Sequence, residues 1–356
     1  MTSTTHDRPV PTDQDTTPTI EQQAAEVVMP LAAGYVGHRT IAIGLRSGLL
    51  ATLAEHPDGM TADALADAHG FDRFYTSVWC RSGLAAGVLV RPDDVGEGYA
   101  LAPHVGTLLL DETSPAYVGS QFTLLHQPEM FDRFEANLAT GTRAWWDDAS
   151  AAFIADVAQS GRAFYIRLIP DGLSQIPGLD ERLADDCRIM DTACGTGFGL
   201  VRLATTYPNA TVVGADGDAH SLDVARERVA DAGLADRVEL VHTPLEELDR
   251  TDEFALVTNN ISMHECRDAD RVTANVRAAL EPGGWFAISD IPFPYTDEGL
   301  RTVPGRVMSG IQFWEAQIDD QLQPRHVNDD LLSRHGFQDI DFVELGPIHA
   351  VTYGHA

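Results

Sequence analysis

Short apolar runs alternate with amphipathic segments through the second half of the chain. The runs CRIM, TVVGA and FALVTNN each have the length and the β-branched content of a buried strand. The segment GFGLVRLA, which follows the first run, places its apolar residues on one face at helical spacing. Strands that alternate with helices predict an open α/β sheet. The final apolar runs, DFVELG and HAVTYG, predict an antiparallel pair of strands at the end of the chain.

The first part of the chain has a helical period instead. Residues 21–57 are rich in Ala, Val and Leu and are apolar on nearly all sides, so these helices need a partner surface. Thr61 can cap a short helix that Gly70 ends, and a second helix runs to Gly87. The runs VLVR and YALAP, joined by PDDVGEG, then predict a hairpin wing. Two helices followed by a wing predict a winged helix.

These patterns divide the chain into four parts. We expect a disordered tail over 1–20, a helical and winged-helix domain over 21–114, a mostly helical connector over 115–185 and the α/β domain over 186–356. The connector contains aromatic side chains that either wall a pocket for a flat substrate or pack between the domains. These aromatic residues are Trp145, Trp146, Phe153, Phe164 and Tyr165.

The composition restricts the partners of the protein. The chain has 356 residues and a formal net charge of −30, and all 24 of its Lys and Arg residues are arginines. Such acidity repels nucleic-acid phosphates and anionic membranes, and the second helix of the winged helix carries only Arg73 and Arg81. The sequence has no apolar run long enough to span a membrane, no signal-peptide pattern and no disulfide framework among its four cysteines. We therefore expect a cytoplasmic protein with no nucleic-acid partner and no membrane partner.

A small-residue turn between the first strand and its helix carries candidate cofactor chemistry. Asp191 ends the strand, and Gly195, Gly197 and Gly199 follow in the turn. Glycines there let a ligand approach the backbone closely, and the helix N-terminus behind them offers free N–H groups. A second acid, Asp216, ends the next strand and suits the two hydroxyls of a ribose.

Both a dinucleotide and S-adenosylmethionine (SAM) contain a ribose, so the turn must decide between them. A dinucleotide turn has the spacing G-x-G-x-x-G and faces a pyrophosphate, whereas this turn reads G-x-G-x-G and follows a carboxylate. Asp191 would repel a pyrophosphate but would attract the ammonium group of a methionine arm. The sequence therefore favours SAM as the cofactor.

The motif DTACGTG resembles the first motif of class I SAM-dependent methyltransferases, D-x-G-x-G-T-G, with Ala193 in place of the first glycine. The similarity continues through the third strand and through LEPGGWFAISD, and it covers roughly residues 188–290. The helices and the wing before it resemble the N-terminal dimerisation domain of plant-type small-molecule O-methyltransferases and their bacterial relatives. The resemblance implies a Rossmann-like, seven-stranded SAM-binding domain preceded by a mostly helical dimerisation domain. It also implies a homodimer formed through the N-terminal helices.

The resemblance also implies which residues contact SAM. Two positions depart from the family pattern: Pro244 replaces the acid that usually binds adenine, and Asn260 replaces a lysine of the plant-type relatives. Glu246, Glu247 or a backbone carbonyl could then hold the adenine amino group, while Leu245 would pack on the ring. The expected SAM-binding residues are Asp191, Ala193, Gly195, Gly197, Asp216, Gly217, Leu245 and Asn260.

The segment ISMHECRDADR follows the fourth strand, where strand ends point toward a ligand crevice. Imidazole has a pKa suited to removing a proton from a hydroxyl near neutral pH, so His264 is a candidate general base. The stretch looks like the H-D-x-x-D segment of plant-type O-methyltransferases, with Glu265 in place of the aspartate. We expect His264 and Glu265 to be the catalytic residues.

A metal is the alternative use of these histidines. His264, His326, His335 and His349 could meet a divalent ion with Glu265, and some relatives that methylate the carbon of an α-keto acid use a histidine-bound metal. The sequence contains neither a His pair at i, i+4 nor a Cys cluster, so we expect no metal.

The sequence as a whole predicts SAM-dependent methyl transfer to a small-molecule acceptor, most readily at a hydroxyl or phenol oxygen. Methylation of carbon or nitrogen, or use of SAM without methyl transfer, is the alternative within the enzyme class. A SAM-sensing transcription regulator is the alternative outside it, and the acidity of the chain disfavours this hypothesis. The setting that the resemblance implies is bacterial secondary metabolism or detoxification.

Overall fold

The computed structural model describes residues 17–92, 96–144 and 148–356. The expected tail up to residue 16 lies outside these ranges, as do Trp145 and Trp146, the two tryptophans expected in a pocket wall. The chain forms two compact units, Met1–Ala102 and Pro103–Ala356. Their boundary lies before residue 114, because the helix at 105–109 and the connector belong to the second unit.

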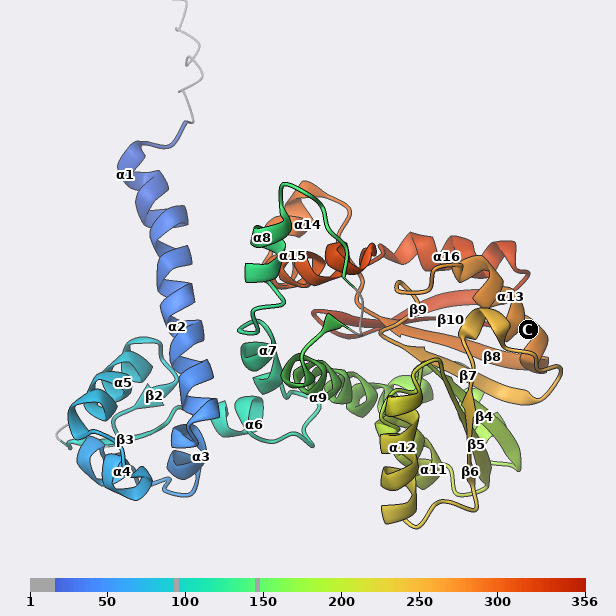
Figure 1. Cartoon of the computed structure of the whole chain (residues 1–356), viewed down its shortest axis with the longest axis horizontal. Coiled ribbons are helices and arrows are strands. Elements are labelled where there is room, and N and C mark those ends of the chain that lie inside the picture. Colours follow the sequence, from blue (N-terminus) through green and yellow to red (C-terminus); the bar gives the residue numbers. More distant parts are fainter. Residues whose placement is uncertain (1–16, 93–95, 145–147) are drawn as a thin grey trace, which may run out of the picture. The chain divides into compact units, whose positions relative to one another are not determined.

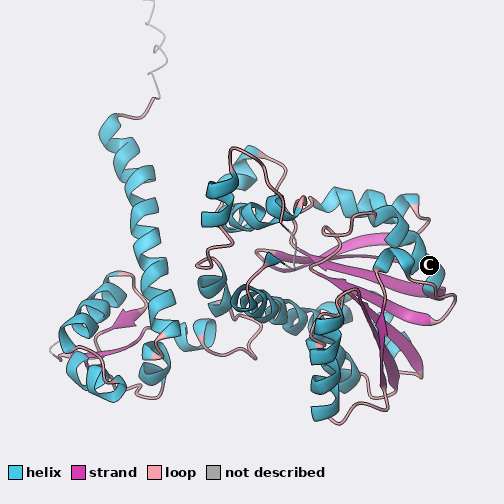
Figure 2. Cartoon of the chain, in the orientation of Figure 1, coloured by secondary structure: helices cyan, strands magenta, loops and turns pink. Residues whose placement is uncertain are grey.

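The first unit consists of helices and a small sheet (Figures 1 and 2). Its three strands pair in the order β1-β3-β2, and both pairings are antiparallel. Thr61 caps α4 by accepting a hydrogen bond from the backbone N–H of Ala64, and Gly70 ends the helix with a φ of 67°. Its elements are α1 (Ile20–Gln23), the π-helical segment η1 (Ala24–Val28), α2 (Met29–Arg46), α3 (Leu49–Ala54), β1 (Met60–Thr61), α4 (Ala62–His69), α5 (Arg73–Ala85), β2 (Leu89–Val90) and β3 (Gly98–Leu101).

The second unit begins with the helical connector expected from the sequence. The longest of its helices, α9, begins at Ser150, whose hydroxyl accepts a hydrogen bond from the backbone N–H of Phe153. The helix ends at Arg167. Before the connector lies α6 (Val105–Leu109), and the described elements of the connector are α7 (Gly119–Leu124), α8 (Asp132–Asn137), α9 (Ala151–Arg167), η3 (Leu168–Gly172), η4 (Leu173–Gln175) and α10 (Leu179–Leu183).

A seven-stranded sheet forms the centre of the second unit, as the family resemblance implies. Its strand order is β6-β5-β4-β7-β8-β10-β9. Strands β4 to β8 run parallel, and β10 pairs antiparallel with both β8 and β9. The order reverses between β4 and β7, where an open α/β sheet has its ligand crevice. The strands are β4 (Cys187–Thr192), β5 (Ala210–Asp216), β6 (Val238–His242), β7 (Phe254–Asn260), β8 (Leu280–Asp290), β9 (Gln338–Gly346) and β10 (His349–His355).

Helices cover both faces of this sheet (Figure 1). Successive strand residues enter two different apolar clusters, because strand side chains alternate between faces. Ile189 and Val212 pack with α11 and α12, whereas the next residues, Met190 and Val213, pack with α13 and α16. The remaining elements are α11 (Phe198–Thr206), α12 (Ala219–Asp231), η5 (Leu245–Glu247), α13 (Ala269–Ala279), α14 (Asp297–Arg301), α15 (Val303–Glu315), η6 (Ala316–Ile318) and α16 (Arg325–Arg334). No helix among the described residues is long and apolar enough to cross a membrane.

Gly199 lets helix α11 approach the connector closely. A Cβ atom there would lie 2.2 Å from a ring carbon of Tyr165 and 2.7 Å from Oδ2 of Asp191. By contrast, a Cβ atom at Gly161, within α9, would meet nothing within 4 Å. The third glycine of the turn is therefore required by packing.

We predict that Gly199→Ala lowers the free energy of unfolding by about 1–3 kcal/mol, because the methyl group overpacks a closed site. Gly161→Ala is the matched control and should raise stability by roughly 0.5–1 kcal/mol, the helix propensity difference. Urea denaturation of both variants measures the two effects. Equal stabilities for the two variants would contradict the packing role of Gly199.

Candidate functional site

Four polar residues end four neighbouring strands of the large sheet. Asp191 ends β4 with Thr192, Asp216 ends β5, Asn260 ends β7 and Asp290 ends β8. These strands run parallel, so their carboxyl ends lie at one edge of the sheet. The structure thus brings three of the predicted site residues together and adds Asp290, which sequence reasoning did not select.

The turn after β4 combines open space with close packing. Ala193, Gly195 and Gly197 have φ values of 55°, 51° and 78°, in the left-handed region. A Cβ atom at Gly195 would meet nothing within 4 Å, whereas one at Gly197 would lie 2.9 Å from the Cβ of Ala225 in α12. Gly195 therefore leaves room for a ligand, and Gly197 allows two helices to pack.

Asp191 lies fully buried beneath the turn. Its two carboxylate oxygens accept hydrogen bonds of 2.8 Å from the hydroxyls of Tyr165 and Thr258. Burial raises the pKa of Asp191 to about 7, even though these two hydrogen bonds favour the charged form. Sequence analysis missed Tyr165 and Thr258 as partners. A contact between Asp191 and the methionine ammonium group stays a prediction.

Asp216 is placed at the mouth of the turn. Its oxygens accept 2.8 Å hydrogen bonds from the backbone N–H groups of Gly195 and Asp218. A carboxylate has about four lone-pair sites, so capacity remains for two ribose hydroxyls. Gly217 follows, and its carbonyl accepts a hydrogen bond from His242. Burial raises the pKa of Asp216 above its ordinary value.

Leu245 lies buried after β6, in the short helix η5. Its carbonyl and that of Glu246 both accept hydrogen bonds of 3.0 Å from the side chain of Asn275. The Glu246 carbonyl also accepts one from Arg271. The structure therefore already uses two of the carbonyls considered for the adenine amino group.

The amide of Asn260 has a defined orientation. Its Oδ1 accepts a 2.7 Å hydrogen bond from the hydroxyl of Ser289. The Asn260 NH₂ group takes no part in this bond and has two N–H donors. A donor there suits a carboxylate or hydroxyl oxygen, although it cannot supply the charge of the lysine that it replaces.

A strained turn places His264. Ile261 follows β7 with a φ of 53°, a conformation that costs a β-branched residue of the order of 1–3 kcal/mol. The backbone N–H of Ile261 donates to the carbonyl of Ser289, and the hydroxyl of Ser262 donates to Asn259. These bonds hold the segment that carries His264 into the interior.

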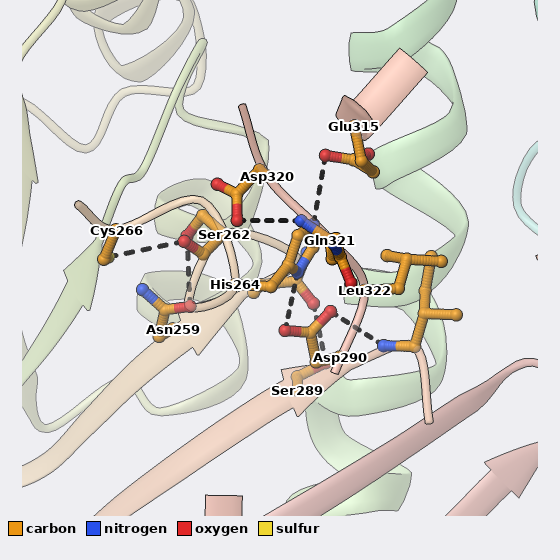
Figure 3. Close-up of polar contacts among 12 residues, drawn as sticks. Asn259, Ser262, His264, Cys266, Ser289, Asp290, Glu315, Asp320, Gln321 and Leu322 are labelled. Atoms are coloured by element: carbon orange, nitrogen blue, oxygen red, sulfur yellow. Dashed lines mark hydrogen bonds and ion pairs between the residues drawn. The ribbon is translucent and has the colours of Figure 1, made fainter. Parts of the chain in front are cut away.

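His264 lies between two carboxylates, and neither is its sequence neighbour (Figure 3). Its Nδ1 lies 2.9 Å from Oδ2 of Asp290, and its Nε2 lies 3.8 Å from Oε2 of Glu315, at the end of α15. The imidazole is 1% exposed, and neither Nε2 nor that oxygen of Glu315 has a hydrogen-bond partner among the described residues. Asp290 and Glu315 were both missed; the position of Asp290 at a parallel strand end was the available signal.

Charge repulsion and burial shift the pKa values in this cluster. Burial alone would lower the pKa of His264, but Asp290, Glu315 and Glu265 raise it to about 10. Burial and repulsion between the carboxylates raise the pKa of Glu265 to about 8 and that of Glu315 to about 7. Asp320 contributes to both shifts. The cluster therefore holds more protons at neutral pH than its members would in water.

His264, Glu265 and Glu315 each offer one ligand atom within 4.8 Å of the others, which is metal-ligand spacing. Of the other histidines considered for a metal, His349 hydrogen-bonds Arg167 and Ser289, and His335 pairs with Asp270. The ring nitrogens of His349 and His335 therefore already have partners other than the residues of the His264 cluster.

Comparison with known proteins identifies the domain. Residues 189–284 match the family model described as "Methyltransferase domain". Methyltransferase GfsG of Streptomyces halstedii is 36% identical over 109 residues, which are 29% of this chain and 37% of that protein. The chain thus spans well under two thirds of this relative. Residues 189–284 are a methyltransferase domain.

Solved structures share the fold over nearly the whole chain. The S-adenosylmethionine-dependent methyltransferase SibL superimposes with a TM-score of 0.69 at 19% identity, covering 94% of this chain and 99% of that one. Mitomycin 7-O-methyltransferase MmcR has a TM-score of 0.66 at 18% identity, covering 94% and 99%. The chain therefore shares the fold of these solved methyltransferases, including that of an O-methyltransferase.

We predict that the stability of the protein falls as the pH rises from about 6 to 8. The folded-state pKa values of Glu315 and Glu265, about 7 and about 8, exceed the ordinary value of 4.5. The folded protein therefore retains protons that the unfolded chain has lost, and this advantage disappears as the pH passes these values. Glu315→Gln should flatten the fall.

Thermal unfolding midpoints across this pH range provide the measurement. Glu344→Gln, which changes an exposed carboxylate on β9, is the matched control and should keep the slope of the wild type. A Glu315→Gln slope equal to that of the wild type would contradict the shared-proton cluster.

Proposed function

We propose that the protein is a SAM-dependent methyltransferase that methylates a hydroxyl or phenol oxygen of a small molecule, with His264 as the general base. The observation that carries the proposal is the pair of contacts on the imidazole. Asp290 accepts a hydrogen bond from Nδ1, and Nε2 has no hydrogen-bond partner among the described residues. A neutral imidazole held by that bond has a free lone pair on Nε2, which can take the proton of the hydroxyl that receives the methyl group.

The residues that would hold the cofactor fit SAM. Gly195 provides space beside a ribose acid, Asp216, and Asn260 presents donors to the same strand edge. SAM supplies an electrophilic methyl group when it is bound. The tasks left to the protein are to position the acceptor and to take its proton.

Each charged neighbour of His264 has a task in that proton transfer. A hydroxyl placed against Nε2 would donate its proton there, which makes the ring an imidazolium. Asp290 at 2.9 Å and Glu315 at 3.8 Å would stabilise this cation. Glu265 adds negative charge to the same cluster only once it has lost its proton, which it holds up to a pKa of about 8. In this proposal Glu265 therefore acts on the base through its charge at higher pH, and Asp290 fixes the tautomer.

We predict that the rate of methyl transfer rises with pH, because a base with a raised pKa is protonated at neutral pH. Below that pKa, kcat/KM should increase about tenfold per pH unit for a phenol acceptor. His264→Gln should lower the rate by roughly 10²–10⁴-fold at neutral pH. In Asp290→Asn, the rise of kcat/KM with pH should shift to lower pH, because the carboxylate that raises the pKa of His264 is gone.

Single-turnover transfer from labelled SAM to a panel of small phenols, measured across pH, tests these expectations. Asp268→Asn is the control, because asparagine can also cap α13 and the side chain lies outside the cluster. A His264→Gln rate close to that of the wild type would contradict the role of His264 as the general base. If the rising part of the pH–rate profile did not shift in Asp290→Asn, the proposed role of Asp290 would be wrong.

We also propose that the protein is a homodimer, built from a second copy packed on the first unit. Large apolar side chains are exposed along the first long helix, α2. A helix that faces water normally carries polar side chains on its exposed face. Tyr35 is 66% exposed, Val36 56% and Met29 61%, and α5 adds Tyr75 at 76%. The acidity of the chain disfavours nucleic acid or a membrane as the partner on this apolar face.

Light scattering at micromolar concentration should give the mass of two chains. The double change Tyr35→Asp and Val36→Asp should shift the protein to the mass of one chain, because charges would be buried at the interface. Leu138→Asp, at a 70% exposed position of the second unit, should leave the dimer intact. A monomeric wild-type protein would refute the proposed assembly.

A further inference from the structure

A cavity of about 160 Å³ lies at the end of helix α9, within the second unit. Its wall is mostly apolar and contains one charged side chain, Arg167, the last residue of α9. Among the residues that line the cavity are Pro115, Tyr117, Phe164, Arg167, Ile348 and His349.

Arg167 has no carboxylate within ion-pair distance among the described residues. Its Nε donates to Nδ1 of His349 at 3.0 Å, and one Nη donates to the carbonyl of Pro115 at 3.2 Å. Burial lowers the pKa of Arg167 to about 10, and no neighbouring acid opposes that shift. The chain carries 54 Asp and Glu residues against 24 arginines. A largely buried arginine with no acidic partner is therefore unexpected.

The protein partners of Arg167 do not neutralise it. His349 is fully buried, and burial together with the charge of Arg167 keeps its pKa well below the ordinary value. It is therefore neutral, accepts from Arg167 at Nδ1 and donates from Nε2 to the hydroxyl of Ser289. That hydroxyl in turn donates to Asn260. In this series of hydrogen bonds, each donor lies on the side of Arg167 and each acceptor is a neutral group. None of these partners neutralises the positive charge of the guanidinium.

The geometry leaves donors for a ligand. A guanidinium has five N–H groups in a planar fork, and the hydrogen bonds to His349 and Pro115 use only two of them. The ring of Phe164 lies under the guanidinium at 4.8 Å and orients its plane. A planar fork of this kind matches a carboxylate with two parallel hydrogen bonds.

We propose that this cavity binds a small apolar carboxylate, with Arg167 as its charge partner and the apolar wall around its hydrocarbon part. The size is suitable, since an engineered apolar cavity of about 150 Å³ binds benzene. Tyr117, Phe164 and Ile348 supply the apolar contacts.

The carboxylate has two possible sources, a separate small anion or the acceptor itself. The cavity wall lies one strand from the site of chemistry, because Ala350, next to His349, pairs with Asp290 in the sheet. An acceptor could therefore place its carboxylate against Arg167. The binding proposal itself does not depend on the proposed methyl transfer.

Calorimetry of the full chain with benzoate, in the absence of SAM, tests the binding. Benzamide has the same shape and no charge, and it should bind at least roughly 10-fold more weakly, the usual effect of a hydrogen bond to a charged group. Arg167→Met should weaken benzoate binding by roughly 10- to 100-fold and leave benzamide unchanged. Arg162→Met is the matched control, because Arg162 lies on the same helix and is paired with Glu112.

Equal binding of benzoate and benzamide by the wild type would overturn the proposal, even if Arg167→Met failed to fold. Absence of benzoate binding, or full benzoate binding by a folded Arg167→Met, would overturn it as well. A transfer assay with hydroxybenzoates and hydroxybenzamides separates the two sources. Competition of benzoate with the hydroxybenzoates would assign the cavity to the acceptor, and binding without competition would assign it to a separate anion.

Discussion

The hydrogen bond between Nδ1 of His264 and Asp290 determines what the rest of the site can do. It spans 2.9 Å inside the protein, and it requires β7 and β8 to end side by side. The turn at Ile261 accepts backbone strain so that the imidazole can reach this carboxylate. Without the bond, the buried ring could choose either tautomer, and Nε2 would no longer be reserved for an incoming proton. In the proposed mechanism the sheet edge, the strained turn and the last residue of β8 act together as the support of one base.

The second constraint is the amount of negative charge that this edge of the sheet buries. Asp191, Asp216, Asp290 and Glu315 are all largely removed from water, and burial raises the pKa of Asp191, Asp216 and Glu315. Such an arrangement is costly in an empty site, because desolvated carboxylates repel one another. It is suited to positive groups, and SAM carries a sulfonium and an ammonium. The imidazolium of the proposed proton transfer is a third positive group. In this proposal the cost in stability serves binding and proton transfer.

Much of the fold follows from the sequence, because alternation and turn residues are local signals. The alternation of strands and helices, the final antiparallel pair and the small-residue turn after Asp191 follow from such signals, whereas the number of seven strands came from the family resemblance. The strand ends also indicated Asp191, Asp216 and Asn260. Partners from distant segments were not predictable in this way. Glu315 approaches His264 from a helix end some fifty residues away, and Arg167 meets His349 across 182 residues. Only the packing of α9 and α15 against the sheet brings these side chains together, and no periodic pattern in the sequence encodes it.

The state of His264 itself is the most direct test of the central claim. Nitrogen-15 NMR of the imidazole, followed across pH in the full chain and assigned with His264→Gln, reports both its pKa and its tautomer. We expect the ring to lose its proton at a pH well above its ordinary pKa of 6.5, and the neutral ring to keep its proton on Nδ1, facing Asp290. A ring that titrates at or below 6.5, or a neutral ring protonated on Nε2, would contradict it.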